Sequence, residues 1–168
     1  MTIAEFDHLP STQQQELLTK CCGSAVWVEK MLEACPVEDL VELLEYAEEK
    51  WYECSDADWL EAFAHHPKIG DTQSLKEKFA DTADWAADEQ SEVAKAANDT
   101  IEALADGNRL YEDKFGYIFI VCATGKSAAE MLALLQVRLQ NAPEVEIEIA
   151  AAEQDKITKL RLEKLFTS

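Results

Sequence analysis

Residues 37–51 read VEDLVELLEYAEEKW, and this segment indicates the fold class more clearly than any other. Its apolar residues recur at steps of three and four, and acidic residues fill most positions between them. This period is typical of an amphipathic helix that turns one face toward a protein core. The inward stripe is expected to contain Val37, Leu40, Val41, Leu44, Ala47 and Trp51.

Comparable helical patterns lie on both sides, and most begin with a residue that can cap a helix. The capping pairs are Thr2/Glu5, Ser11/Gln14, Ser55/Asp58, Ser74/Glu77 and Ser127/Glu130, with Ser24 as a single cap. Two longer helices are predicted, one from about residue 84 to Gly107 and one from about residue 144 to 166. Expected inward residues of three of these helices are Trp59, Leu60 and Phe63, then Met131, Leu134, Leu135 and Leu139, then Ile157, Leu160 and Leu165.

One segment departs from the helical pattern. Residues 117–123 read YIFIVCA, lie between Gly116 and Gly125, and have the composition of a short buried strand. No second convincing strand exists to pair with it, so we expect an extended segment threaded between helices. The predicted fold is all-α: a compact single-domain bundle of about eight to nine helices over residues 1–168, with this extended segment running through it.

Charge and hydropathy exclude several classes of partner. The formal net charge of −19 argues against nucleic acid and anionic membrane partners, because both require basic patches. The apolar run at 117–123 is far shorter than the roughly 20 residues of a membrane-spanning helix. The N-terminus lacks a basic region followed by an apolar core, so a cytoplasmic location is expected.

The five cysteines are an odd set without a CxxC pair: Cys21, Cys22, Cys35, Cys54 and Cys122. Reduced, buried thiols are the expected state, and neither a disulfide framework nor a metal site is predicted.

A candidate for proton transfer lies in the stretch HHPKIGD at residues 65–71. Pro67 lacks an amide donor and biases His66 away from helical geometry, so His66 is expected on a stiff loop between helices. An imidazole with an ordinary pKa of about 6.5 suits proton transfer near neutral pH. A surface histidine that only ends a helix is the plainer alternative.

Two further charged residues lie on helix faces that are otherwise apolar. Glu89 is four residues before Val93 on one predicted inward stripe, although it could also stay solvated in the first helical turns. Arg161 is four residues from both Ile157 and Leu165 on another stripe. A buried arginine needs a partner, which could be a carboxylate such as Glu89 or an anionic substrate.

The sequence resembles the 2-oxo-4-hydroxy-4-carboxy-5-ureidoimidazoline (OHCU) decarboxylase family of purine catabolism. The matching segments are HPKIG at 66–70, EQ at 89–90, KFGYIFI at 114–120, GKS at 125–127, KI at 156–157 and LRL at 160–162. Their order and spacing extend over nearly the whole chain. The resemblance implies an all-helical homodimer that uses no metal or organic cofactor and converts an anionic small-molecule substrate to (S)-allantoin.

The resemblance also assigns roles to individual residues. His66, Glu89 and Arg161 take the catalytic positions, and the substrate-binding positions are Pro67, Lys68, Gln90 and Ile118. Lys68 stands where the family often has arginine, and Ala86 where it commonly has serine, so these two positions depart from the pattern.

Two other functions stay open at this point. One is a family relative that acts on another ureido or imidazoline acid, and the other is a non-enzymatic acidic helical module that binds proteins. Trp27, Val28 and Met31 could line a dimer interface, but burial within the monomer explains the same spacing and is expected.

Overall fold

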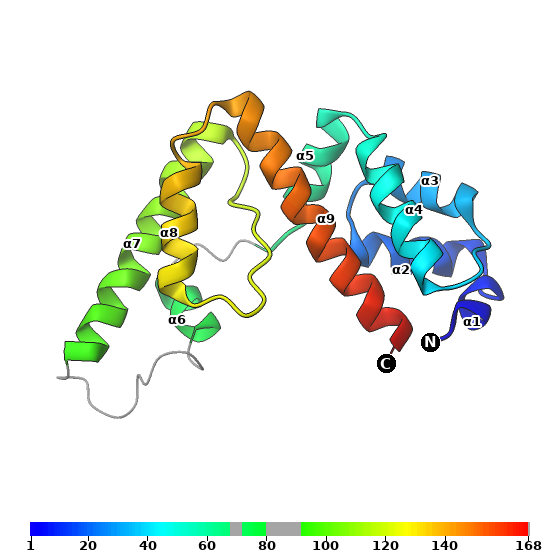
Figure 1. The fold of residues 1–168 in the computed structure, drawn as a ribbon, viewed down its shortest axis with the longest axis horizontal. Helices are drawn as coiled ribbons and strands as arrows, with labels where there is room; N and C mark the ends of the chain where they lie inside the picture. The colour runs from blue at the N-terminus through cyan, green and yellow to red at the C-terminus, as the bar shows by residue number, and fades with distance from the viewer. Residues whose placement is uncertain (68–71, 80–91, 168) are drawn as a thin grey trace. The chain divides into compact units, whose positions relative to one another are not determined.

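The computed structural model describes residues 1–67, 72–79 and 92–167. These residues form helices and no strand, so the predicted all-α class is confirmed (Figure 1). The nine helices are α1 (Ile3–Asp7), α2 (Ser11–Cys21), α3 (Ala25–Ala34), α4 (Leu40–Tyr52), α5 (Asp56–Ala64), α6 (Thr72–Lys78), α7 (Glu92–Phe115), α8 (Ala128–Arg138) and α9 (Pro143–Thr167).

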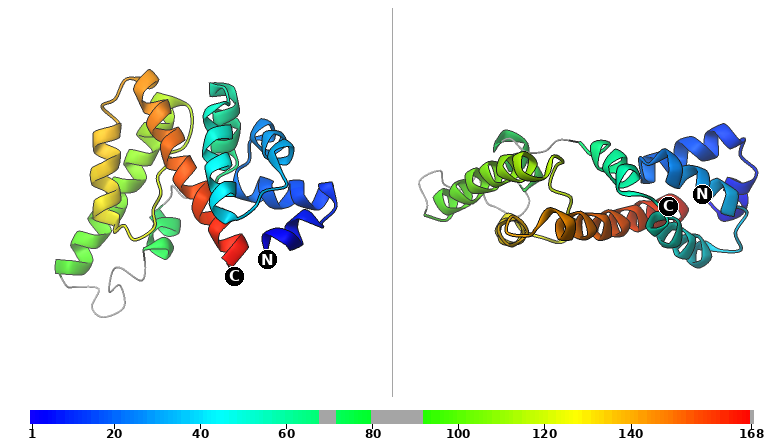
Figure 2. Two further views of the ribbon diagram at one scale, coloured as in Figure 1. Left: turned by 45° about the vertical axis from the view of Figure 1, so that its right-hand side comes forward. Right: turned by 90° about the horizontal axis from the view of Figure 1, so that it is seen from above.

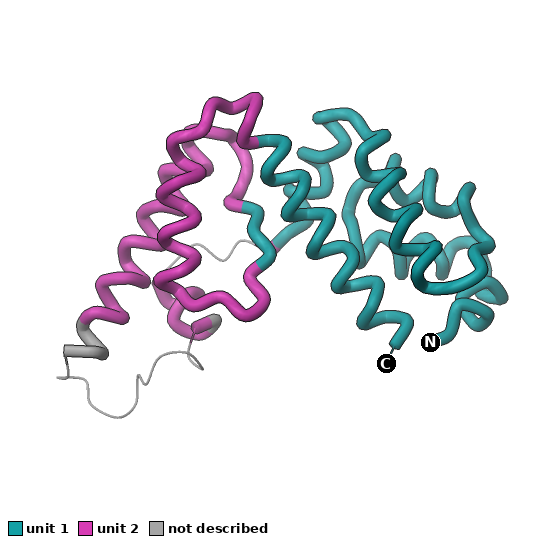
Figure 3. Tube along the Cα trace, viewed as in Figure 1, with its two compact units in different colours: residues 1–66, 120–122, 147–168 teal, residues 67–119, 123–146 magenta. Residues whose placement is uncertain are grey.

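The chain divides into two compact units, each described by itself (Figure 3). Unit 1 contains Met1–His66, Ile120–Cys122 and Ile147–Ser168, and unit 2 contains Pro67–Phe119 and Ala123–Glu146. The helix α9 begins in unit 2 and continues through unit 1. The prediction of one domain over residues 1–168 stays a prediction.

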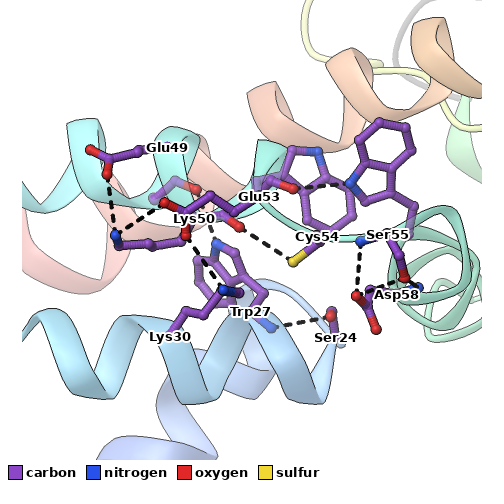
Figure 4. A network of polar contacts seen from close by, with 12 residues as sticks. Ser24, Trp27, Lys30, Glu49, Lys50, Glu53, Cys54, Ser55 and Asp58 are labelled. Atoms are coloured by element: carbon purple, nitrogen blue, oxygen red, sulfur yellow. Dashed lines mark hydrogen bonds and ion pairs between the residues drawn. The ribbon is translucent and has the colours of Figure 1, made fainter.

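Side chains cap several of the helices as predicted. Thr2 and Glu5 form a reciprocal box, with the Thr2 N–H donating to Glu5 Oε2 at 2.7 Å. Ser55 and Asp58 form another, and Ser24 accepts from the Trp27 N–H (Figure 4). Each cap satisfies amides that have no partner within the helix.

Two predicted caps are wrong. Ser11 is the first residue of α2 rather than its cap, because Pro10 occupies the cap position. Its expected partner Gln14 instead donates its side-chain amide to the Phe6 carbonyl at 2.8 Å. Ser74 lies inside α6, which begins at Thr72.

Three buried tryptophans link the helices of unit 1. The Trp27 indole N–H donates to the Ala47 carbonyl, Trp51 to Ala151 and Trp59 to Trp51, at 2.8–3.0 Å. These bonds let large apolar rings be buried without leaving the indole N–H unsatisfied. The bond from Trp51 also ties α4 to α9, which runs through unit 1 in both views of Figure 2.

Residues Trp27, Val28 and Met31 of α3 are at most 2% exposed within this single chain. Burial inside the monomer, the plainer of the two sequence interpretations, is therefore confirmed.

In α4 the predicted stripe is partly wrong, since Leu43 is fully buried and Val41 is 64% exposed. The core face follows Leu43, Ala47 and Trp51 at steps of four, which turns Val41 toward solvent. In α5, Trp59 and Phe63 are buried as expected, but Leu60 is exposed.

In unit 2, α7 does not end at Gly107 as predicted. It continues to Phe115, and Gly116 follows with a φ of +84° that suits glycine. Gly107 instead lies where α7 packs against α8, because a Cβ there would be 2.5 Å from Leu135 Cδ2. The predicted start of this helix near residue 84 lies outside the described residues.

The inward face of α8 contains a charge that the sequence pattern did not indicate. Met131 and Leu135 are buried as expected, but Leu134 is exposed and Arg138 is buried. The Arg138 guanidinium pairs at 2.6 Å with Glu146, which also accepts hydrogen bonds from Tyr111 and Asn141. Burial and then the Glu146 contact raise the pKa of Tyr111 far above its usual range. This network compensates the buried charges of unit 2.

The segment at residues 118–123 is neither helix nor strand, as predicted. Its residues Ile120 and Cys122 are buried and belong to unit 1. The Cys122 N–H donates to Glu153 Oε1 of α9 at 3.3 Å, so a side chain takes the place of a strand neighbour.

All five cysteines are free, and all but Cys35 are buried. None of the helices among the described residues is long and apolar enough to cross a membrane.

Candidate active site

The end of α5 places two adjacent histidines beside α9. The Ser55–Asp58 box fixes the start of α5, and its last turn closes with the His65 N–H on the Ala62 carbonyl. His66 follows outside the helix, as the proline after it predicts. The two imidazoles are therefore held by a capped nine-residue helix.

His66 is half-buried and hydrogen-bonded through its ring. Its Nε2 lies within hydrogen-bonding distance of Gln154 Oε1 on α9. Burial lowers the pKa of His66, the Gln154 contact opposes that shift, and the charges of Arg161 and His65 reinforce it. The imidazole is therefore neutral near pH 7 and has one nitrogen that can accept a proton.

Arg161 is half-buried on α9. Its Nη1 donates to the Cys21 carbonyl at 3.2 Å, at the end of α2. Among residues 1–67, 72–79 and 92–167, this carbonyl is its hydrogen-bond partner and no carboxylate pairs with it. One bond to a carbonyl uses one of the five guanidinium N–H groups, which leaves others for an anion.

The buried face of α9 differs from the face predicted from the sequence. Ile157, Leu160 and Leu165 are half-buried, whereas the buried face contains Ala151, Gln154, Asp155, Thr158 and Leu162. Arg161 therefore lies at the edge of the core rather than within it. That position explains how it reaches a pocket while remaining partly solvated.

The side chains of His66 and Arg161 line the same pocket of about 320 Å³. Its lining residues, all in unit 1, are Thr19, Lys20, Gly23, Ala62, His65, His66 and Arg161. Lys20 adds a second cation at the end of α2, and none of the described residues that line the pocket is acidic. The pocket is therefore suited to a small anion next to a group that transfers protons.

The structure brings His66 and Arg161 together across 95 positions of sequence. The positions of the other predicted site residues relative to this pocket stay predictions. Glu89, Gln90 and Lys68 lie outside the described residues, as does Ala86. Pro67 and Ile118 belong to unit 2, so their predicted contacts with a substrate stay predictions.

Gln154 is the site residue that sequence reasoning missed. It is completely buried and lies seven positions before Arg161, which is two helical turns along α9. The sequence did offer one indication, because Gln154 is a polar residue two turns from Arg161 on the same helix. This indication was overlooked because the inward face of the helix had been assigned to Ile157 and Leu160.

Fold and pocket together define an all-helical protein with a cationic pocket that contains a neutral imidazole. A sequence model of the OHCU decarboxylase family matches residues 7–163. The chain belongs to this family.

Individual relatives agree with that assignment. The chain is 44% identical over 149 residues to the uric acid degradation bifunctional protein TTL of Arabidopsis thaliana, covering 88% of this chain and 45% of that protein. It thus spans less than half the length of that relative. A crystal structure of OHCU decarboxylase in the presence of (S)-allantoin is 40% identical, with a TM-score of 0.72 over 89% of this chain and 96% of the other. A crystal structure of (S)-allantoin synthase is 21% identical, with a TM-score of 0.73 over 99% of this chain and 54% of the other, and shares the fold.

Proposed function

We propose that this protein decarboxylates 2-oxo-4-hydroxy-4-carboxy-5-ureidoimidazoline to (S)-allantoin in urate degradation. The observation that carries the proposal is the joint placement of His66 and Arg161 on one pocket. The relative named for uric acid degradation and the OHCU decarboxylase structure with (S)-allantoin support the choice of substrate.

The reaction breaks one carbon–carbon bond. Carbon dioxide leaves C4, the ring carbon that carries the hydroxyl, and the bonding electron pair forms a C4=C5 double bond while the C5=N pair moves onto the ring nitrogen. The 4-hydroxyl then loses its proton as C4 becomes a carbonyl, and a proton is delivered to C5, the carbon that carries the ureido group. The catalyst must therefore neutralise the developing negative charge and supply the proton to one face.

His66 is the proposed proton-transfer group. A neutral imidazole can accept a proton from the substrate 4-hydroxyl and return one to C5, the carbon that carries the ureido group, and burial favours this neutral state by lowering the pKa. The contact with Gln154 restricts the ring, so the transfer has a fixed direction.

Arg161 is the proposed electrostatic group. Its guanidinium is held by the Cys21 carbonyl and binds the substrate's ring carbonyl oxygen, where negative charge develops. Lys20 is a second cation on the same pocket and favours the anionic substrate over neutral analogues.

The remaining roles follow from the family resemblance. Glu89 and Gln90 orient the ureido nitrogens, and Pro67, Lys68 and the backbone at Ile118 complete the binding site. A single domain over residues 1–168 is part of the same proposal, and the family match over residues 7–163 supports it.

Three further features belong to the proposal. The protein works without a metal or organic cofactor, because an imidazole and a guanidinium can supply the acid–base and electrostatic chemistry required. It forms a homodimer, as the resemblance implies, which sedimentation analysis tests. It resides in the cytoplasm, a reducing compartment that suits five free cysteines.

The direct test adds the protein to freshly generated substrate and follows optical activity. The proposal expects optically active allantoin to form faster than in buffer or with heat-inactivated protein, and dialysis against a chelator should leave the rate unchanged. A rate equal to that of buffer contradicts the proposed activity. Loss of activity on chelation contradicts only its cofactor-free part.

A further inference from the structure

His66 lies at one end of a row of buried polar side chains, and the members of this row beyond Gln154 have no part in the proposed reaction. Next to it is Gln154, whose Nε2 donates to Thr158 Oγ1 at 3.0 Å. Thr158 in turn contacts the Cys22 thiol. Gln154, Thr158 and Cys22 are at most 3% exposed, so water does not substitute for any of these partners.

The order of donors and acceptors in this row determines which ring nitrogen of His66 carries hydrogen. An amide side chain has one donor end and one acceptor end. Since the NH₂ group of Gln154 faces Thr158, its oxygen faces the imidazole. An oxygen in that position accepts only from an N–H, so Nε2 is the protonated nitrogen.

Thr158 is what keeps the amide in this orientation. Its hydroxyl oxygen accepts from Gln154 Nε2 at 3.0 Å, so its one hydrogen is available to the Cys22 sulfur, whose pKa the Thr158 contact lowers. The Cys22 thiol is an apolar and inert end of the row, because burial raises its pKa to about 12 despite the Thr158 contact.

We propose that Gln154, oriented by Thr158, is a positioning residue that fixes His66 as the Nε2–H tautomer and leaves Nδ1 as the nitrogen that exchanges a proton with the substrate. The assignment of the tautomer is independent of the activity, and only its use in catalysis rests on the proposed function. In histidines generally, a hydrogen bond made by one imidazole nitrogen determines whether the other nitrogen carries a proton or can accept one.

The tautomer is measurable in the substrate-free full-length chain. Long-range proton–nitrogen NMR spectra distinguish a protonated from an unprotonated ring nitrogen, and the chain has three histidines. The signals of His66 are those missing from a His66→Gln variant. The proposal expects a protonated Nε2 and an unprotonated Nδ1 above the pH at which this ring titrates. An Nδ1–H tautomer overturns it.

A set of threonine variants tests the role of the row. Thr158→Val keeps the shape but removes the acceptor for the Gln154 amide, so the amide is free to turn over. We expect mixed tautomers and a kcat reduced about tenfold with little change in KM, a part of the 10²–10⁴-fold that acid–base catalysis contributes. Thr158→Ser should restore both readouts.

The matched control is Thr167→Val on the same helix, where the hydroxyl donates to the Glu163 carbonyl at the exposed end. It should keep the wild-type tautomer and rate. If Thr158→Val also keeps both, the positioning role is wrong. If the tautomer responds as expected while wild-type protein forms no allantoin, the positioning stands and the proposed function fails.

Discussion

Gly23 and His65 lie so close together that a Cβ at Gly23 would come within 2.4 Å of His65 Cγ and 2.6 Å of its Cβ. These atoms are near the backbone of the α5 terminus, so they cannot move aside as the end of a long side chain could. The glycine between α2 and α3 therefore permits the close approach of the two histidines to α2. Both Gly23 and His65 line the pocket.

Replacing Gly23 with alanine should destabilise the protein by about 1–3 kcal/mol, the usual cost of overpacking, and should lower turnover because His65 and His66 move together. Urea unfolding and initial rates measure the two effects. A Gly23→Ala variant as stable as wild type contradicts this account, because the added Cβ would then fit without moving His65.

The depressed pKa of His66 predicts a pH dependence of stability. Burial is the main cause of the shift, so the folded state binds the proton less readily than the unfolded chain. The unfolded state then holds more protons between the two pKa values, and stability rises with pH across that window. The contribution is present above the ordinary histidine pKa of about 6.5 and is lost as pH falls through the folded value.

Urea unfolding of wild type and His66→Gln between pH 5 and pH 8 measures this term. The stability difference between the two proteins should shift in favour of wild type as pH rises through this range. A difference that is constant with pH would show that the pKa of His66 is not lowered by folding.

Prediction from sequence succeeded for features that depend on a few neighbouring residues, such as helix starts. It failed where the buried face of a helix includes polar side chains. Capping pairs such as Ser55/Asp58 identified helix starts, because a cap depends on a few neighbouring residues. The inward face of α9 was misplaced, since its core side includes Gln154, Asp155 and Thr158, which a hydrophobic period cannot recognise. Arg161 lines a pocket together with His66 although the face assigned to its helix was wrong, and its role in a site stays a prediction.

The same limit applies to unit 2. Gly107 resembles a helix end in sequence, but the nearby Leu135 of α8 shows that it is a packing glycine, and only tertiary contact distinguishes the two. Arg138 was likewise invisible, because its partner Glu146 lies on another helix. The predictions at Glu89 and Gln90 fall outside the described residues and stay predictions.

The buried network of unit 2 leads to a stability prediction. Replacing Glu146 with glutamine removes the charge that compensates Arg138 and should cost about 3–5 kcal/mol, as breaking a buried pair does. The double variant Arg138→Met with Glu146→Leu should be closer to wild type, because it removes both charges. Urea unfolding of the three proteins tests this, and a double variant less stable than Glu146→Gln contradicts the explanation by charge.

The net charge of −19 leads to a kinetic prediction. The long-range field repels an anionic substrate, whereas Lys20 and Arg161 attract it only at close range. Salt screens interactions beyond about 8 Å at physiological ionic strength, so added salt should raise the association rate modestly. Stopped-flow measurements at low substrate over a series of salt concentrations test this, and a pronounced fall in rate contradicts it.

The central claim is that His66 transfers the proton in a decarboxylation within the unit 1 pocket. The most direct measurement compares formation of (S)-allantoin from freshly generated substrate by wild type and His66→Gln, with circular dichroism spectra showing that both are folded. The account predicts that the folded variant loses about 10²–10⁴-fold in turnover, the usual contribution of a general acid–base group. Near-normal turnover by the folded variant would contradict it.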